Sequence, residues 1–264
     1  MCTLRRFVLW LDVPVEDVTN KKILQYIDAL LDDRLQPKTV NSHLDSIRGF
    51  YEYLRDVEEI PITNPVRRGY TLRLSRPLPR YLRDEEIRKL FEVINRPRDK
   101  AIFMVMLRCG LRVEEVAGLT LRALDLKRRK IIVEQGKGEK GRVVYISNDA
   151  FDALFQYLRV RPSSRAKKLF LVDKGSCFGK PISVRGIQKR IEYYARKARL
   201  KVSCHQLRHT MATQLLNADA DLVTIQDLLG HSRIKTTRRY CKVSNLKVQR
   251  DYFKAMEAVM ERLP

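Results

Sequence analysis

One stretch near the C-terminus, residues 204–242, constrains the fold of this chain more than any other; it reads CHQLRHTMATQLLNADADLVTIQDLLGHSRIKTTRRYCK. Its apolar residues Leu207, Met211 and Leu215 recur every four positions, which predicts one buried stripe along a helix. A second helical pattern covers residues 221–229, and Gly230 supplies the expected helix stop. The stretch therefore predicts two short packed helices followed by a segment too polar to be core.

Polar residues suited to phosphate chemistry accompany these two helices. His205 and Arg208 are three positions apart, so they lie one helical turn from each other, where both can bind one anion. His231 follows the helix stop, and Tyr240 comes nine residues later in a basic, threonine-rich run. Guanidinium and imidazole groups can bind a phosphodiester, and a phenolate can attack one. The set predicts binding and cutting of a phosphodiester.

The motifs HQLRH and LGH and the tyrosine after them resemble the catalytic box of the tyrosine recombinases, the integrase and Xer-like site-specific recombinases. Upstream, CGLRVEEVAGL around Arg112 and GKGEKGRVVYI around Lys137 resemble other signatures of that family, and all stand in the family's order. The resemblance implies an enzyme that cuts and rejoins DNA strands through a 3′-phosphotyrosyl intermediate, with no metal, ATP or other cofactor.

Each motif residue then has an expected role. Arginines neutralise charge on the phosphate, histidines hydrogen-bond or move protons, and the tyrosine is the nucleophile. The resemblance assigns Lys137 as proton donor to the leaving 5′ oxygen, with Lys140 as the alternative. Glu115 is expected to orient Arg112, and His209 to support its helix. The predicted catalytic residues are Arg112, Lys137, His205, Arg208, His231 and Tyr240.

The charge of the chain predicts a polyanionic partner, since the formal net charge is +22. Residues 1–72 hold 10 Lys and Arg against 11 Asp and Glu, whereas residues 73–264 hold 43 against 20, so the excess lies in the second part. A solvated basic surface is the alternative interpretation. With double-stranded DNA as the expected partner, the predicted contact residues are Arg67, Arg68, Arg73, Arg76, Lys140, Arg142, Arg185, Lys189 and Arg190.

The periodicity predicts a mainly α fold with a small β-sheet. Residues 1–66 are expected to form a helical domain, which the resemblance identifies as a core-binding domain, shorter than the family's pattern. Residues 67–80 form a basic linker rich in proline and arginine. Residues 81–264 form an α+β catalytic domain, with a helix capped by Asp84, a hairpin over 130–134 and 142–146, and a tail helix over 246–260.

Other classes of protein fit less well. The five cysteines are spaced like reduced thiols, and no apolar run could span a bilayer, so we expect a cytoplasmic, nucleoid-associated protein. His205 and His209 are four apart, as in zinc sites, but the glutamate of HExxH is missing, and no metal site is predicted. His43 is expected on the surface.

Two alternatives to a recombinase remain open at this stage. A type IB topoisomerase uses the same side chains to relax supercoils, and a DNA-binding regulator could keep the fold without cleaving. The family resemblance further implies a homo-oligomer on DNA, a tetramer when two duplexes exchange strands.

Overall fold

The chain divides into two compact units, residues 1–77 and 78–264, and the division falls within the predicted linker. The computed structural model describes residues 3–74, 80–134 and 141–230, together with Thr237, Tyr252 and Met256. Among these residues no helix is both long and apolar enough to cross a membrane. The predicted tail helix over 246–260 lies outside the described residues, apart from Tyr252 and Met256.

Unit 1 is built from the helices α1 (Thr3–Trp10), α2 (Asn20–Asp32) and α3 (Pro37–Asp56), with short 3-10 turns at Val15–Asp17 and Arg68–Tyr70. α2 begins where the Oγ1 of Thr19 accepts a hydrogen bond from the backbone N–H of Lys22, so Thr19 is the N-cap of this helix. α3 has a proline in its first turn, where the missing N–H costs nothing. The apolar faces of the three helices form one core.

His43 was expected on the surface, and that prediction is wrong. The residue is only 7% exposed, and its Nδ1 lies 3.0 Å from the hydroxyl of Tyr26. Burial disfavours the charged imidazole and lowers the pKa of His43 below its usual value of 6.5. His43 is therefore a hydrogen-bonded core residue of unit 1, which a helical pattern with polar neighbours does not reveal.

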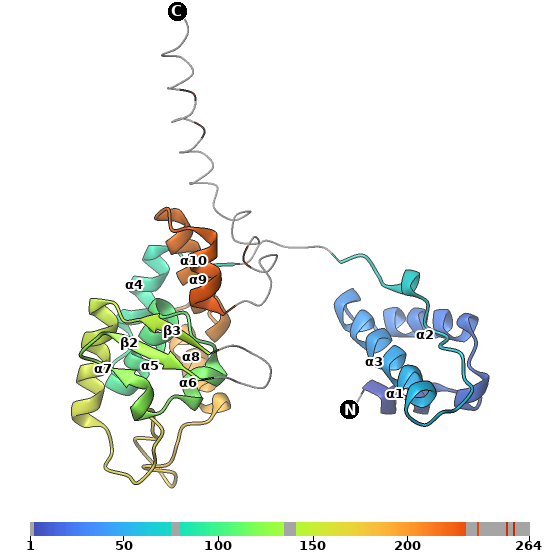
Figure 1. Cartoon of the computed structure of the whole chain (residues 1–264), viewed down its shortest axis with the longest axis horizontal. Helices are drawn as coiled ribbons and strands as arrows, with labels where there is room; N and C mark the ends of the chain where they lie inside the picture. Colours follow the sequence, from blue (N-terminus) through green and yellow to red (C-terminus); the bar gives the residue numbers. More distant parts are fainter. Residues whose placement is uncertain are drawn as a thin grey trace, which may run out of the picture. The chain divides into compact units, whose positions relative to one another are not determined.

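Unit 2 is arranged around α5 (Pro97–Arg108), most of whose residues are buried because it is apolar on nearly every side. The helices α7 (Asn148–Val160), α8 (Val184–Lys197) and α9 (Cys204–Asn217) pack against it, as Figure 1 shows. The shorter helices are α4 (Asp84–Glu92), α6 (Val113–Gly118) and α10 (Leu222–Leu229). The N-cap of α4 is Arg83 rather than Asp84, which lies in the first turn.

A small antiparallel sheet completes unit 2, with strand order β1 (Leu124–Asp125), β2 (Lys130–Val133) and β3 (Arg142–Tyr145). The predicted hairpin corresponds to β2 and β3, whereas β1 was not predicted. Ile131 and Val144 pair and are both fully buried, while their neighbours Ile132 and Val143 are exposed, as period-two alternation requires. The prediction of a mainly α fold with a small sheet is confirmed.

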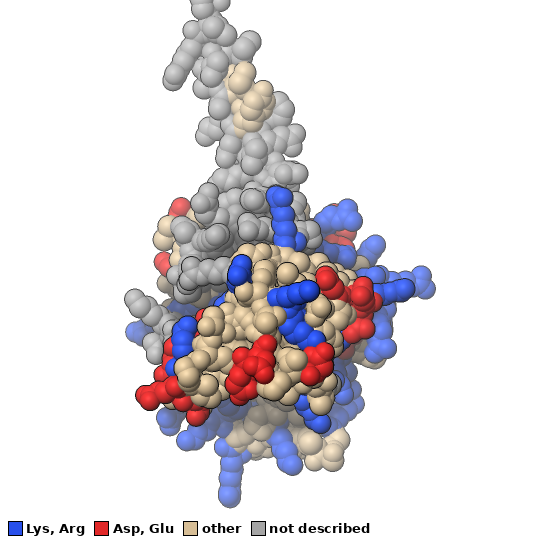
Figure 2. Space-filling model, turned by 90° about the vertical axis from the view of Figure 1, so that its right-hand side faces the viewer, with Lys and Arg blue, Asp and Glu red and all other residues tan. Residues whose placement is uncertain are grey.

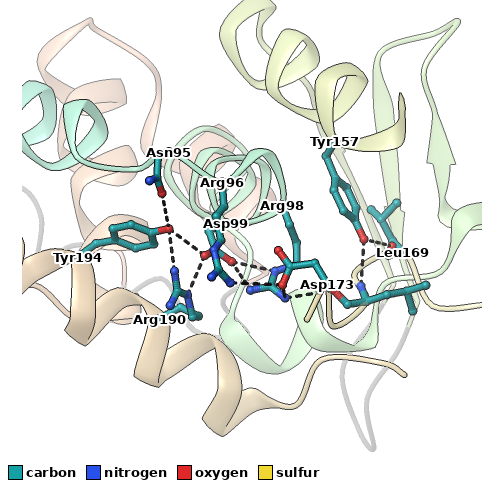
Figure 3. A network of polar contacts seen from close by, with 10 residues as sticks. Asn95, Arg96, Arg98, Asp99, Tyr157, Leu169, Asp173, Arg190 and Tyr194 are labelled. Carbon is teal, nitrogen blue, oxygen red and sulfur yellow. Dashed lines mark hydrogen bonds and ion pairs between the residues drawn. The ribbon is translucent and has the colours of Figure 1, made fainter. Parts of the chain in front are cut away.

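A buried polar network joins α5 to α8 (Figure 3). Asp99 of α5 is 0% exposed and accepts hydrogen bonds from Arg98 Nε at 2.8 Å, Arg190 Nε at 2.7 Å and the Tyr194 hydroxyl at 3.0 Å. Arg98 also binds Asp173, in the irregular segment before α8, at 2.7 Å. A buried carboxylate persists only with such partners, so the network fixes the position of α8.

We expect Asp99→Asn to lower the free energy of unfolding by about 3 to 5 kcal/mol, because the buried Arg98 and the partly buried Arg190 lose their shared counter-charge. Glu85→Gln is the matched control: its partner Arg88 is 4.0 Å away and both side chains are more than half exposed, so the expected loss is under about 1 kcal/mol. Urea unfolding of the three proteins measures both effects. Equal losses in the two variants would contradict a structural role for Asp99.

Candidate active site

A cavity of about 650 Å³ opens between the start of α6, α8 and the start of α9. Its lining includes Arg112, His205 and Arg208, three of the six predicted catalytic residues. Arg112 precedes His205 and Arg208 by more than 90 positions in the chain, so only the fold brings it to them. Carboxylate side chains of Glu114 and Glu192 line the same cavity.

Arg208 is the most deeply buried of the three, with only 2% of the side chain exposed. It stands in the second turn of α9, whose start is fixed by a 2.8 Å hydrogen bond from the Ser203 N–H to Gln206 Oε1. Its Nη1 donates to the carbonyl of Gly110, and its Nη2 donates to the carbonyl of Leu229. One guanidinium thus joins α9 to the end of α5 and the end of α10.

Gly110 lies at this junction with a φ of +66°, a conformation that strains residues with side chains. A Cβ there would lie 3.1 Å from both Leu229 Cδ2 and Met211 Sδ. Glycine therefore permits the close approach that places the Gly110 carbonyl within reach of Arg208. Gly110, which follows the C-cap of α5, therefore also shapes the wall of the cavity.

Arg112 is the N-cap of α6, and 28% of its side chain is exposed. Its Nη1 donates to Glu115 Oε1 over 3.1 Å, and its Nη2 donates to the carbonyl of Gly230 over 3.2 Å. The backbone N–H of Arg112 also donates to Glu115 Oε2 over 2.7 Å. Glu115 was predicted to orient Arg112, and the two residues lie in direct contact.

Glu115 also accepts hydrogen bonds from Arg142, an arginine of β3. Arg142 Nη1 donates to Oε1 over 2.6 Å and Nη2 to Oε2 over 2.8 Å, a two-pronged pair. Burial alone would raise the pKa of Glu115, but the hydrogen bonds from Arg142 and Arg112 and the charges of Arg142 and Arg208 outweigh it. The pKa therefore lies below the usual 4.5, and the carboxylate is ionised at neutral pH.

A pH-dependent stability follows for Glu115→Gln. With the folded pKa lowered, the stabilisation by the ionised carboxylate is fully present above the unfolded value near 4.5 and is lost as the pH falls through the folded value. At pH 7 we expect the variant to be less stable by about 2 to 4 kcal/mol. The difference should shrink below about pH 4.5. Urea unfolding between pH 7 and pH 3 checks this, and a pH-independent gap would contradict it.

The two neighbouring histidines of α9 lie against each other. The ring centroids of His205 and His209 are 4.2 Å apart and the rings are nearly perpendicular. His205 is exposed and lines the cavity, whereas His209 is half-buried. His209 is placed where it can support the orientation of the His205 ring. Within the described residues, no cluster of three His, Cys, Asp or Glu side chains could hold a metal ion.

A cysteine in the cavity wall is not equipped to act as nucleophile. Cys204 lines the cavity at the start of α9, and burial raises the pKa of its thiol to about 12. A thiol attacks as the thiolate, which is almost absent at neutral pH with such a pKa. The cavity therefore offers arginine and histidine donors, and Cys204 is present as the neutral thiol.

The residues predicted to contact DNA have varied surroundings. Arg67, Arg73, Arg185 and Lys189 are exposed. Arg190 instead binds Asp99 and lies over the ring of Tyr194, 4.8 Å from its centroid (Figure 3). On the part of the chain nearest the viewer in Figure 2, acidic side chains lie between basic ones. Contact of these residues with DNA stays a prediction.

Some of the predicted catalytic and DNA-contact residues lie outside the described residues: Lys137, Lys140, His231, Tyr240, Arg76 and the side chain of Arg68. Their roles stay predictions from the sequence. His231 is nevertheless adjacent in the chain to Gly230, whose carbonyl binds Arg112.

Arg142 and Gly230 have structural roles that the sequence interpretation missed. A usable signal was present for Arg142, because residues 142, 144 and 146 share one face of a strand and Val144 and Ile146 are apolar. That alternation predicts an inward-facing guanidinium, which requires a carboxylate partner. No comparable signal identifies Glu115 as that partner, since the two are 27 positions apart.

A family model and several known proteins match this chain in sequence. Residues 80–246 match the model of the phage integrase family. Tyrosine recombinase XerC of Thermodesulfovibrio yellowstonii is 38% identical over 216 residues, which cover 78% of this chain and 71% of the relative. Tyrosine recombinase XerA of Thermococcus kodakarensis is 31% identical over 260 residues, covering 97% and 88%.

Solved structures show the same fold. The Tn1549 transposon integrase in complex with transposon right end DNA has a TM-score of 0.78, with 19% identity and coverage of 96% of this chain and 91% of that one. The lambda integrase dimer bound to a COC′ core site has a TM-score of 0.72, with 16% identity and coverage of 90% and 85%.

Proposed function

The chain belongs to the phage integrase family and is a site-specific tyrosine recombinase, and from this premise we propose that its cavity binds the scissile phosphate of a DNA strand. The observation that supports this proposal most directly is the convergence of Arg112, His205 and Arg208 on one cavity. All three side chains donate hydrogen bonds, and two carry permanent charge. Non-bridging phosphate oxygens are acceptors that suit this arrangement.

Tyr240 is the nucleophile in this proposal. Its phenolate oxygen forms a bond to phosphorus while the bond from phosphorus to the 5′ oxygen breaks, which leaves a 3′-phosphotyrosyl link and a 5′ hydroxyl. Lys137 donates the proton to the leaving oxygen, and His205 and His231 hydrogen-bond the phosphate or accept the phenol proton. The link retains the free energy of the phosphodiester. A 5′ hydroxyl of another strand can therefore reverse the step without ATP.

Charge neutralisation is the main contribution of the two cavity arginines. As phosphorus becomes five-coordinate, negative charge builds on its non-bridging oxygens, and fixed donors stabilise that charge without reorganising. Arg208 is held by the Gly110 and Leu229 carbonyls and Arg112 by Glu115 and the Gly230 carbonyl. Each guanidinium is thus positioned before DNA arrives.

The working form proposed for this chain is a homo-oligomer on double-stranded DNA. The lambda integrase comparison is a dimer on a core site, which supports assembly on DNA. Exchange between two duplexes requires four strand cleavages and one tyrosine for each. We therefore propose a tetramer for the complex that joins two sites, and light scattering of that complex measures its mass.

A covalent-trapping experiment tests the proposed function. Nicked duplexes of randomised sequence let the short 5′-hydroxyl fragment diffuse away after cleavage, so the phosphotyrosyl adduct accumulates. We expect a protein–DNA adduct that survives denaturation, forms in EDTA without ATP, and carries DNA on the peptide containing Tyr240. Sequencing the attached strand then identifies the cleavage site.

Two outcomes would contradict the proposal. DNA binding with no adduct would indicate a protein that binds without cleaving. An adduct on a peptide without Tyr240 would reassign the nucleophile. Family membership and the recombinases among the relatives support strand exchange over the topoisomerase alternative, and a duplex rebuilt from the trapped sequence should recombine with a second copy of itself.

A further inference from the structure

Among the predicted DNA-contact residues whose side chains the structure describes, Arg142 is the most buried, with only 9% of its side chain exposed. It begins β3 on the face of the sheet that also carries the fully buried Val144. Both ends of its guanidinium bind Glu115, at 2.6 and 2.8 Å, and its Nε donates to the carbonyl of Leu228 over 2.8 Å. These contacts are all within the protein.

Glu115 connects Arg142 to the two arginines of the cavity. Its Oε1 accepts from Arg112 Nη1 as well as from Arg142, and its Oε2 lies 4.0 Å from Arg208 Nη1. One carboxylate therefore faces three guanidiniums. Its distance to each depends on how firmly the others hold it, and Arg142 holds both of its oxygens.

The end of α10 provides a second connection between the same three arginines. The carbonyls of Leu228, Leu229 and Gly230 accept from Arg142, Arg208 and Arg112 respectively. These carbonyls carry the partial negative charge of a helix C-terminus, which favours cations. Three successive residues of one helix end thus each bind a different arginine.

The backbone at Gly230 is shaped around Arg142. Gly230 has a φ of +60°, and a Cβ at this position would lie 3.0 Å from Arg142 Cδ and 3.1 Å from its Nη1. The arginine therefore packs directly against the residue that ends α10. His231, predicted to act in catalysis, is the next residue in the chain.

We infer that Arg142 is a positioning residue for DNA cleavage: it fixes the Glu115 carboxylate and the end of α10, and through them the Arg112 and Arg208 guanidiniums. The inference rests on the proposed function of the cavity. Without Arg142, Glu115 turns toward the two cavity arginines and the α10 end loses one of its three cationic partners. Both shifts move donors away from the phosphate, and a misplacement of about 1 Å can cost roughly 100-fold in rate.

The test separates affinity from cleavage in Arg142→Gln and Arg142→Lys. DNA affinity is measured by fluorescence anisotropy at several salt concentrations, and cleavage is measured under single turnover with saturating nicked DNA of the trapped sequence. We expect unchanged affinity and salt dependence, with cleavage slower by about 10- to 100-fold in the Gln variant and less in the Lys variant, which keeps one contact. Arg128→Gln, at a 77% exposed arginine in the turn between β1 and β2, should cleave like the wild type.

A double variant tests the route of action. If Arg142 acts through Glu115, the protein with both Glu115→Gln and Arg142→Gln should cleave about as slowly as the slower single variant, whereas independent effects would multiply. A DNA-contact role predicts the opposite pattern, with weaker binding, a salt slope lower by about one and normal cleavage at saturation. That pattern would overturn the inference.

The remaining outcomes are also decisive. If both Arg142 variants cleave at the wild-type rate, the inference about Arg142 is overturned and the proposed function stands. If the wild-type protein itself forms no adduct, both the proposed function and the inference are overturned. Loss of folding in both variants, seen as unfolding below the assay temperature, would show a purely structural residue. Folding of the Lys variant with intact DNA affinity and slow cleavage supports the inference even where the Gln variant does not fold.

Discussion

Replacing Tyr240 with phenylalanine should abolish the covalent DNA adduct and slow strand cleavage by at least about 10⁴-fold, because the substitution removes only the attacking oxygen. DNA affinity should stay within about twofold, since a single hydroxyl contributes little to a contact dominated by phosphate charges. Denaturing gels measure the adduct, and anisotropy measures binding.

Tyr252→Phe is the matched control for this substitution. Tyr252 lies twelve positions after Tyr240, and the residue is 58% exposed. We expect its loss to leave adduct formation unchanged. An adduct that persisted in Tyr240→Phe and vanished in Tyr252→Phe would show that the motif spacing had indicated the wrong tyrosine.

Replacing Arg208 with lysine should slow cleavage at saturating DNA by about 100- to 1000-fold while leaving the charge unchanged. The three donors of a lysine share one nitrogen, so they cannot reach the Gly110 and Leu229 carbonyls from the two separate positions that Nη1 and Nη2 of Arg208 occupy and still bind a phosphate oxygen. One buried carbonyl would then lack its donor, and the free energy of unfolding should fall by about 1 to 3 kcal/mol. Single-turnover cleavage and urea unfolding measure the two effects.

Arg196→Lys is the control for Arg208→Lys, because Arg196 is an exposed arginine on α8 in the same unit. It should change neither cleavage nor stability beyond about 0.5 kcal/mol. A less than tenfold effect of Arg208→Lys on cleavage would contradict the geometry proposed for the phosphate, because a point charge would then serve as well as the fixed fork.

The elements that surround the cavity were predictable because their signals are local. A stripe of apolar residues predicted α9, the glycine stops ended α5 and α10, and period-two alternation predicted the β2–β3 hairpin. The Thr19 cap was predictable in the same way, from one residue before a helical pattern. Local chemistry also explains the error at Asp84, since several polar residues at a helix start compete for the cap.

The missed features depend on contacts between distant segments. The burial of His43 depends on Tyr26, seventeen positions away, and two partners of Asp99, Arg190 and Tyr194, lie on another helix. Arg142 was predicted to contact DNA, although its place in the strand alternation directs its side chain inward. Its burial requires Glu115 and the α10 end to meet it, and no periodicity in one strand encodes that meeting.

The three arginines that converge on residues 228–230 bind main-chain oxygens, which every amino acid supplies. Side-chain replacements at Leu228 and Leu229 leave the acceptors in place, whereas one at Gly230 would press on Arg142. One residue inserted into or deleted from α10 would instead turn its end by about 100° and shift it by about 1.5 Å, displacing all three acceptors at once. We therefore expect α10 to tolerate amino-acid substitutions far more readily than insertions or deletions.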